Sequence, residues 1–336
     1  MFFNCRVPRI KLSDGSVVLV SVPWSHSGSG FTLLFEAYCM TLIQSELSVS
    51  DVASLLGVTA PRIWRVFDYW MAQATVAEDL SEVSQLGIDE TSSKKGHKYI
   101  TVFVDMENRN VIDVQADKDS KTITNFVEYL ESKKGDRNHI ENVCIDMSPA
   151  FISGTRKMLP SSKITFDKFH IVQHINKAMD TVRKDERKGN DLLKNHKYTY
   201  SRLNKNLTDE KRKELEYLNM LYPNLGDAYR LKEMFLVLFQ IKDSVEAKLH
   251  LTSWCDLVME SGIQPFVKFV CLLKGHWSGI VNYFDTKLTN GILEGINSKI
   301  QLAKRRARGF RNIKNFINMI ILICGKIKFN YPLKTL

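Results

Sequence analysis

Apolar residues recur every three or four positions between residues 32 and 69, and this spacing predicts three consecutive helices. Ser48 or Ser50 is expected to cap the start of the second helix, and Gly57 follows its end. Pro61 stands in the first turn of the third helix, where a proline is tolerated. A short helix, a tight turn that contains glycine and a longer helix together predict a helix-turn-helix.

The third predicted helix turns its apolar residues inward and leaves Arg62 and Arg65 outward near its N-terminal end. The N-terminal residues of a recognition helix are those that contact base edges in DNA. We therefore expect Arg62 and Arg65 to bind DNA. An ordinary three-helix bundle has the same layout and is the alternative.

Beyond residue 84 the spacing of apolar positions changes to the alternation typical of β-strands. Three strands follow one another closely and two more alternate with helices, which gives the order β-β-β-α-β-α-β-α. Such an order predicts antiparallel hairpins continued by parallel crossover units, with helices on both faces of the sheet. The expected fold class is therefore α/β, with an RNase H-like mixed sheet. The predicted strands cover residues 85–89, 97–105, 110–115, 142–146 and 163–166.

Residues 170 to about 285 are almost wholly helical in pattern, so an all-helical insertion is expected to interrupt the α/β core. Within it, Thr208 caps one helix and Pro223 breaks the pattern that follows. The predicted domains are an N-terminal segment with a flexible linker at 25–30 (1–30), a helix-turn-helix domain (31–78), the first part of the catalytic core (84–175), the helical insertion (176–285), and the last core helices with a basic DNA-binding tail (286–336).

Charge is the one unusual feature of the composition. The chain has 336 residues with 44% hydrophobic and 25% charged, an ordinary globular balance, but 47 Lys and Arg stand against 37 Asp and Glu. This gives a net charge of +10 and indicates an anionic partner: nucleic acid, an acidic membrane surface or a polyanionic protein. No acidic residue follows Glu294, so the whole surplus lies in residues 295–336. The basic residues there are Lys299, Lys304, Arg305, Arg306, Arg308, Arg311, Lys314, Lys326, Lys328 and Lys334.

Cysteine spacing and hydropathy exclude several other classes of protein. The six cysteines contain no C-x-x-C pair, so the spacing predicts neither a zinc ribbon nor a disulfide scaffold, and most are expected to be small buried residues. No apolar run is long enough to cross a bilayer, and no leader peptide opens the chain. We expect a soluble cytoplasmic protein without a membrane partner.

Two aspartates are the strongest candidates for chemistry. Asp89 ends the first predicted strand and Asp146 ends the fourth, and these strands are neighbours in an RNase H-like sheet. Enzymes that act on phosphodiesters gather carboxylates to hold two Mg²⁺ ions, because hard cations prefer oxygen ligands. A charge that closes an apolar strand needs a partner or a metal. Taken singly, each aspartate has the alternative reading of a helix or turn cap.

A third carboxylate is expected from a helix that packs on the same sheet. Leu293, Ile296, Ile300 and Ala303 form an apolar stripe at helical spacing in the segment that begins near residue 288. Glu294 then shares a polar face with Ser298, Gln301 and Arg305, a combination suited to a metal ligand beside a phosphate backbone. A solvated helix face is the alternative.

Three further residues are candidates for accessory roles. His170, just after the fifth predicted strand, either orients a phosphate or metal ligand or is a structural histidine, whereas Asp167 before it is assigned only as a helix cap. Trp277 either stacks on a flipped base or packs in the core. Asn297 is the third accessory candidate.

Four segments together resemble the ISL-three group of bacterial insertion-sequence transposases, over nearly the whole chain from about Val7. They read I-D-E-T-S-S-K-K-G-H-K-Y-I-T-V-F-V-D at 88–105, D-M-S-P-A-F at 146–151, F-D-K-F-H at 166–170 and N-G-I-L-E-G-I-N-S-K-I-Q-L-A-K-R-R-A-R-G-F at 290–310. The resemblance implies a DDE transposase in which Asp89, Asp146 and Glu294 bind two Mg²⁺ (or Mn²⁺) ions. Because the basic residues begin on the helix that carries Glu294, we expect Lys299, Lys304, Arg305, Arg306 and Arg308 to bind DNA beside that site.

The partners implied are the inverted terminal repeats and target DNA, bound by a homodimer or higher oligomer associated with the bacterial nucleoid. One departure from the group concerns its N-terminal zinc-binding segment, because here R-V-P-R-I-K is followed by Leu12, Ser13 and Asp14, and only Cys5 is nearby. Four zinc ligands are not available, so residues 1–30 are expected to be a remnant. The alternatives are a truncated or non-catalytic DNA-binding protein that acts as a repressor, and a general nuclease.

Overall fold

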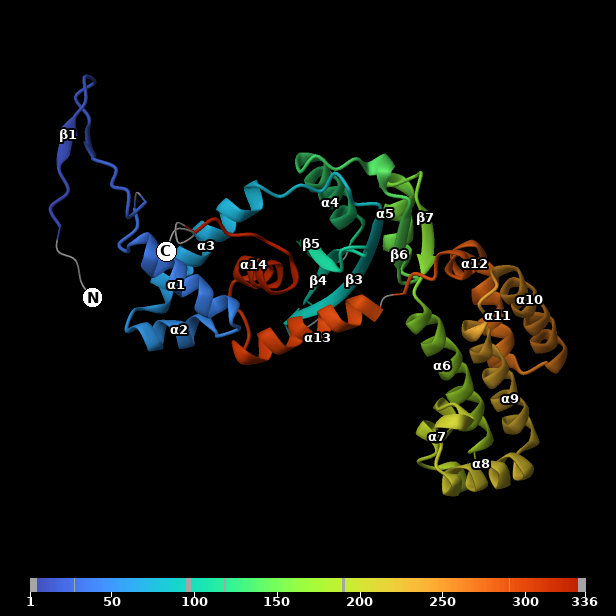
Figure 1. The fold of residues 1–336 in the computed structure, drawn as a ribbon. Helices are drawn as coiled ribbons and strands as arrows, with labels where there is room; N and C mark the ends of the chain where they lie inside the picture. Colours follow the sequence, from blue (N-terminus) through green and yellow to red (C-terminus); the bar gives the residue numbers. More distant parts are fainter. Residues whose placement is uncertain are drawn as a thin grey trace.

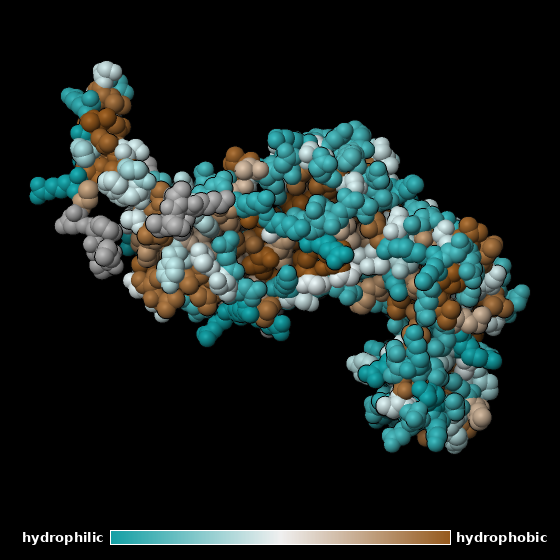
Figure 2. All heavy atoms as spheres, in the orientation of Figure 1, coloured by the Kyte–Doolittle hydropathy of each residue, from teal (hydrophilic) through white to brown (hydrophobic). Residues whose placement is uncertain are grey.

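The computed structural model describes residues 5–26, 28–94, 98–117, 119–188, 191–289 and 291–331. His97, where the second strand was predicted to begin, and Lys334 lie outside these residues, as do Ser27 and Asn290. The N-terminal segment forms a short antiparallel hairpin of β1 (Arg9–Lys11) and β2 (Val17–Leu19) that projects from the rest of the chain (Figure 1). Its apolar side chains are exposed, as the brown spheres at the upper left of Figure 2 show.

Three helices follow the hairpin. They are α1 (Leu33–Gln44), α2 (Val49–Leu56) and α3 (Ala60–Val76). Ser48 caps α2 by accepting a 3.2 Å hydrogen bond from the amide of Asp51, and Gly57 ends it in the left-handed conformation (φ +64°). These two local signals place the turn between α2 and α3 where the sequence predicts it. Helix α3 runs past the predicted end near residue 69, because Trp70 and Met71 are also buried in the core of the three helices.

A buried carboxylate ties the predicted linker to these helices. Glu36 of α1 has no exposed surface, and its carboxylate accepts a 3.0 Å hydrogen bond from the Trp70 indole and lies 3.0 Å from Nε2 of His26. The His26 ring stacks on Tyr69 with centroids 3.7 Å apart. The Oγ of Ser25 donates a 2.8 Å hydrogen bond to the carbonyl of Phe31. Both described residues at the start of the predicted flexible linker are therefore fixed by side-chain contacts.

The central sheet has five strands in the order β5-β4-β3-β6-β7. Strand β4 pairs antiparallel with both β3 and β5. Strand β6 pairs parallel with β3, and β7 pairs parallel with β6, which confirms the expected mixed sheet. The strands are β3 (Gln85–Lys94), β4 (Lys98–Asp105), β5 (Asn110–Ala116), β6 (Asn142–Ile145) and β7 (Lys163–Phe166).

The predicted end of the first core strand at Asp89 is wrong. Strand β3 continues to Lys94, so Asp89 lies in its middle. Thr91 and Ser93 are polar yet buried, and the Ser93 hydroxyl donates a 3.0 Å hydrogen bond to the carbonyl of Lys98 on β4. Cross-strand pairing therefore supports a polar segment that the sequence pattern leaves outside the predicted strand.

Helices cover both faces of the sheet, as expected. Helices α4 (Ser120–Ser132) and α5 (Pro149–Met158) pack on the face that carries Phe103 of β4. Helices α13 (Gly291–Arg306) and α14 (Ile313–Cys324) pack on the opposite face, which carries the neighbouring Val102 and Val104. The alternation of side chains along β4 thus separates two hydrophobic cores.

In the described part of the chain, seven α-helices lie between the last strand and α13, and most of them form the arm at the lower right of Figure 1. Pro223 follows α8 as a break, and it also begins α9. Helix α12 returns to the sheet, where Asn282 donates a 2.8 Å hydrogen bond to the carbonyl of Ile164 on β7. The helices are α6 (Lys168–Glu186), α7 (Lys197–Ser201), α8 (Asp209–Leu221), α9 (Pro223–Val237), α10 (Ser244–Ser261), α11 (Gln264–Gly275) and α12 (Trp277–Thr286).

Up to Tyr331, the predicted basic tail is a packed part of the fold. Helix α14 buries Phe316 and Ile320 between the sheet and the N-terminal helices, because its apolar residues recur at helical spacing. Asn318 donates a 3.3 Å hydrogen bond to Asp68 of α3. The last described residue, Tyr331, contacts Trp70 edge-on. The charge that follows Glu294 is therefore presented by an ordered surface. Across the described ranges, no helix is both long and apolar enough to cross a membrane.

Candidate active site

Asp89 and Asp146 occupy equivalent positions on neighbouring parallel strands. The last paired residues of β3 and β6 are Gly87 and Cys144, and each aspartate comes two residues later. Their carboxylates act on one another, since Asp146 is one of the groups that raise the pKa of Asp89. The structure therefore brings together the first two predicted site residues, which are about 57 positions apart in the sequence.

A third aspartate follows the next strand in the same way. Ile145 pairs with Phe166 across β6 and β7, so Asp146 and Asp167 are also equivalent in register. Asp167 is 3% exposed and precedes α6, as a capping residue would, but its side chain makes no capping hydrogen bond. Nε2 of His170, in the first turn of α6, lies 4.0 Å from its carboxylate. Sequence reasoning assigned Asp167 only as a cap; the signal it missed is a third acid directly after a parallel strand.

Helix α13 runs alongside β3 in a matched register. Four helical residues rise about 6 Å, close to the advance of two strand residues, so every fourth helix residue meets every second strand residue. A Cβ on Gly87 would stand 2.5 Å from Sδ of Met106 and 2.9 Å from Cδ1 of Leu293, so the glycine leaves room for these two side chains where the helix crosses β3. Along the helix, Asn297 donates a 2.8 Å hydrogen bond to Asp89, Gln301 donates one of 2.9 Å to Thr91, and Lys304 donates one of 2.8 Å to the carbonyl of Ser92.

Opposing effects act on the pKa of the Asp89 carboxyl. Burial raises the pKa of the Asp89 carboxyl above its usual value, and the charge of Asp146 adds to the rise. Hydrogen bonds from the Glu90 amide (2.8 Å) and from Asn297, together with the nearby imidazole of His170, favour the ionised form. Both carboxylate oxygens accept a hydrogen bond, so the side chain is held in one orientation.

Glu294 occupies a different setting from the two aspartates. It is exposed in the first turn of α13, one turn before Asn297. Considering only the described residues, no three His, Cys, Asp or Glu side chains lie close enough together to hold a metal ion. The polar face that contacts β3 consists of Asn297, Gln301 and Lys304, and it overlaps the predicted face only at Gln301.

The donor set still fits a hard divalent cation. Asp89 and Asp146 present oxygen ligands, and a carboxylate whose pKa is raised by burial, and further by a second carboxylate, is one that a cation stabilises. Ser148 donates a 2.9 Å backbone hydrogen bond to Asp146, which leaves the second oxygen of that side chain as a possible ligand. Asn297 donates a hydrogen bond to Asp89, as residues that orient metal-binding carboxylates do.

The predicted DNA-binding residues differ in their exposure and in their contacts with other residues of the chain. Arg65 is exposed on α3, whereas Arg62 is half-buried and its guanidinium lies 4.2 Å from the centre of the Phe31 ring. Arg306 forms an ion pair with Glu46 of the N-terminal helices. Lys304 is bonded to β3, whereas Lys299, Arg305 and Arg308 are exposed, as is the paired Arg306.

Trp277 packs against a hydrophobic core, and most of the cysteines are buried. Trp277 is half-buried at the start of α12 and packs against the largest core, as its core alternative predicts. All six cysteines are free, and four are buried, while Cys5 and Cys271 are exposed.

Comparison with known protein families gives two matches. The model for the ISL3 group of DDE domains, described as a transposase, matches residues 86–320. The helix-turn-helix domain of transposase family ISL3 matches residues 20–71, which confirms the predicted helix-turn-helix.

Similar proteins cover most of the chain. The transposase for insertion sequence element IS1557 of Mycobacterium tuberculosis (strain CDC 1551 / Oshkosh) is 24% identical over 354 residues, across 96% of this chain and 78% of the relative. The counterpart in strain ATCC 25618 / H37Rv gives the same values. The transposase for insertion sequence element IS1001 of Bordetella parapertussis is 29% identical over 323 residues, across 93% of this chain and 79% of the relative.

Proposed function

The chain belongs to transposase family ISL3, and from this membership we propose that it cuts DNA at the ends of an insertion sequence and joins them to target DNA. Asp89, Asp146 and Glu294 are the proposed metal-binding residues. The observation that carries the proposal is the equivalent placement of Asp89 and Asp146 on neighbouring parallel strands. The strand order β5-β4-β3-β6-β7 supports an RNase H-like core, with the α6–α12 helices as the insertion.

The reaction has two phosphoryl transfers. In the first, a water oxygen bonds to a phosphorus at the element end, and the 3′ oxygen leaves as a hydroxyl. In the second, this 3′ hydroxyl attacks a phosphodiester of the target, and the displaced target 3′ oxygen leaves. Two Mg²⁺ or Mn²⁺ ions, when bound, neutralise phosphate charge and lower the pKa of bound water.

The chain's own residues supply position and charge. Asp89 is held through both oxygens by Glu90 and Asn297, so it presents a fixed ligand. Asp146 directly follows β6, the strand next to β3, and Glu294 is proposed to complete the site from the exposed first turn of α13 when DNA and metal are bound. His170, whose charge acts on Asp89, is proposed to orient the scissile phosphate.

DNA is proposed to lie across two surfaces. The helix-turn-helix would enter the major groove with Arg65 at the start of α3. The exposed cations Lys299, Arg305 and Arg308 would neutralise the phosphates of the strand being cut. Because an insertion sequence has two ends, we expect a homodimer or higher oligomer on DNA, acting at the nucleoid of the bacterial cytoplasm.

Cleavage and strand transfer on DNA that carries the flanking inverted repeats test this proposal. Asp89→Asn, Asp146→Asn and Glu294→Gln are each expected to abolish cleavage in Mg²⁺ while DNA binding persists. Glu216→Gln, an exposed acid on α8, is the matched control and should leave cleavage unchanged.

The assay also separates the competing functions. A wild-type protein that shifts element-end DNA but never nicks it in Mg²⁺ or Mn²⁺ would be a DNA-binding repressor. Cleavage without any strand-joining product would identify a general nuclease. A Glu294→Gln variant with wild-type cleavage would remove Glu294 from the metal site.

A further inference from the structure

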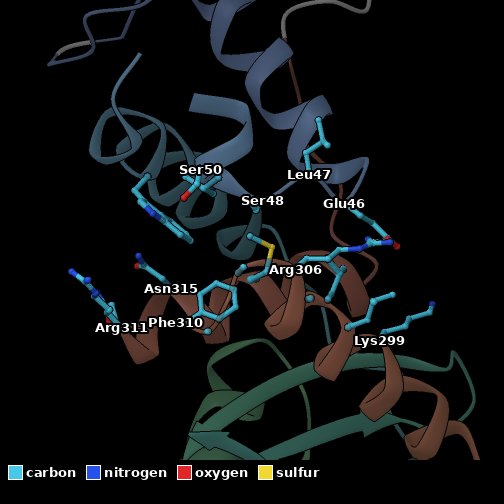
Figure 3. Close-up of a pocket in the computed structure, with 18 residues that line it drawn as sticks. Glu46, Leu47, Ser48, Ser50, Lys299, Arg306, Phe310, Arg311 and Asn315 are labelled. Atoms are coloured by element: carbon cyan, nitrogen blue, oxygen red, sulfur yellow. Dashed lines mark hydrogen bonds and ion pairs between the residues drawn. The ribbon is translucent and has the colours of Figure 1, made fainter. Parts of the chain in front are cut away.

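A cavity of about 280 Å³ lies where the N-terminal helices meet the last two helices of the chain (Figure 3). Its walls come from the start of α2, from α3, from the last turns of α13 and from the segment that leads into α14. Asp89, Asp146 and Glu294 lie elsewhere, so this interdomain pocket is separate from the candidate metal site. Its size is near the lower end of the range for small-ligand sites.

Aromatic rings line the inside of the interdomain pocket. Phe310 stacks on Phe316 with centroids 4.9 Å apart, so one face of the Phe310 ring is occupied and the remainder is free to line the cavity. Trp64 stands edge-on to Phe310 with centroids 6.4 Å apart. Both Phe310 and Trp64 are half-buried, and Ala303 adds a small apolar wall from α13. Such surfaces accept a flat, largely apolar ring.

The polar groups of the pocket match the rest of a nucleotide. Asn315 contributes an amide that can both donate and accept, as is needed at the edge of a base. Arg306 and Arg311 are exposed at the pocket, and guanidinium groups bind phosphate through paired hydrogen bonds. Glu46 offsets only Arg306, so the lining carries a net positive charge. Figure 3 shows Arg306 and Arg311 on opposite sides of Phe310.

We propose that the interdomain pocket binds one unpaired nucleotide of the DNA strand, with its base against Phe310 and Trp64 and the phosphates on its two sides at Arg306 and Arg311. The proposal rests on the proposed function only in taking DNA as the ligand. The aromatic interior accounts for the base, and the cationic rim accounts for the phosphate.

The position of the pocket fits a strand that passes the metal site. Asn297, which holds Asp89, and Arg306 lie nine residues apart on α13, which corresponds to about 14 Å. One strand of DNA advances about 3.4 Å per nucleotide, so this distance corresponds to about four nucleotides. A strand that follows α13 from the cleaved phosphate therefore brings a nearby nucleotide to the pocket.

Binding of two single-stranded probes to the full chain, measured by fluorescence anisotropy in EDTA, tests the proposal. One probe is an oligothymidylate of about twelve nucleotides, and the other is an abasic strand of equal length and charge. Wild type is expected to bind the oligothymidylate about tenfold more tightly. Phe310→Leu, which removes the aromatic face, and Ala303→Leu, which fills the cavity, should bring the two affinities within about twofold.

Matched controls separate the pocket from general DNA binding. Tyr217→Leu, an exposed aromatic residue on α8, should keep the tenfold preference. Arg308→Ala, an exposed cation outside the pocket, should weaken both probes equally. An unchanged preference in both Phe310→Leu and Ala303→Leu, or no preference in wild type, overturns the proposal. Because the assay contains no metal, that result leaves cleavage of element-end DNA, and hence the proposed function, standing.

Discussion

Asn297 of α13 donates a 2.8 Å hydrogen bond to Oδ2 of Asp89 in the middle of β3, and this contact joins two segments that are 208 residues apart. It fixes the level at which α13 lies on the sheet. Together with the Glu90 amide, which donates to Oδ1, it also fixes the orientation of the Asp89 carboxylate.

Asn297→Ala is expected to raise the Mg²⁺ concentration needed for half-maximal cleavage by about ten- to a hundredfold, because residues that orient a metal ligand contribute that much to affinity. The cleavage rate at saturating Mg²⁺ should change much less. Cleavage measured across a Mg²⁺ titration checks this. Ser298→Ala, on the exposed side of the same turn, is the control. A loss of rate without any change in metal dependence would mean that Asn297 only stabilises the fold.

The basic residues after Glu294 are expected to contribute unequally to DNA affinity. Arg305→Ala should reduce the slope of log affinity against log salt by about one, because one phosphate contact is lost. Arg306 is paired with Glu46 in an exposed ion pair, so Glu46→Gln should free it and tighten DNA binding. Affinities of the three proteins measured between low and moderate salt check both statements. Equal slopes for wild type and Arg305→Ala would show that Arg305 does not touch phosphate.

Asp113 on β5 gives the clearest pH-dependent stability. It is 5% exposed, and burial, with the charge of Glu78, raises its pKa to about 6. When a carboxyl has a higher pKa in the folded state, the folded protein loses stability as the pH rises. The loss occurs between the pKa of the unfolded chain, near 4, and the pKa of the folded protein, about 6. Asp113→Asn removes this cost, and the amide oxygen of the substituted side chain can still accept from the Val114 amide, as the Asp113 carboxylate does at 2.8 Å. The Gln115 side-chain amide, which donates a 2.6 Å hydrogen bond to the other carboxylate oxygen, must turn over to accept from the new amide group.

The expected result is a variant more stable than wild type by about 2 to 3 kcal/mol at pH 7, with the difference vanishing near pH 4. Urea denaturation at several pH values measures it. Glu107→Gln, an exposed acid near the same hairpin, should show no comparable gain. A variant that is less stable than wild type at pH 7 would contradict this account of Asp113.

Local signals explain which parts of the fold the sequence predicts. Ser48 and Gly57 determine the ends of α2 through hydrogen bonding and backbone conformation, and both act within a few residues. The short apolar strands β6 and β7 are likewise recognisable because they are buried on both faces. These elements are close to their predicted bounds.

Long-range pairing explains what the sequence does not predict. The continuation of β3 past Asp89 depends on β4, and burial of α14 depends on the sheet and α3 together. The contact of Asn297 with Asp89 requires the register of a helix on a strand. Asp167 belongs beside Asp146 only once β7 is paired with β6. None of these relationships is contained in a single stretch of chain.

The central claim is that Asp89 is a metal ligand beside Asp146 in a DNA-cutting site, and substitution with cysteine tests it most directly. Mg²⁺ binds oxygen ligands and rejects sulfur, whereas the softer Mn²⁺ tolerates a thiolate better. Cleavage of element-end DNA by Asp89→Cys is therefore measured in Mg²⁺ and in Mn²⁺, with DNA binding as a control. We expect loss of cleavage in Mg²⁺ and partial recovery in Mn²⁺. Wild-type cleavage by Asp89→Cys in Mg²⁺ would contradict the account.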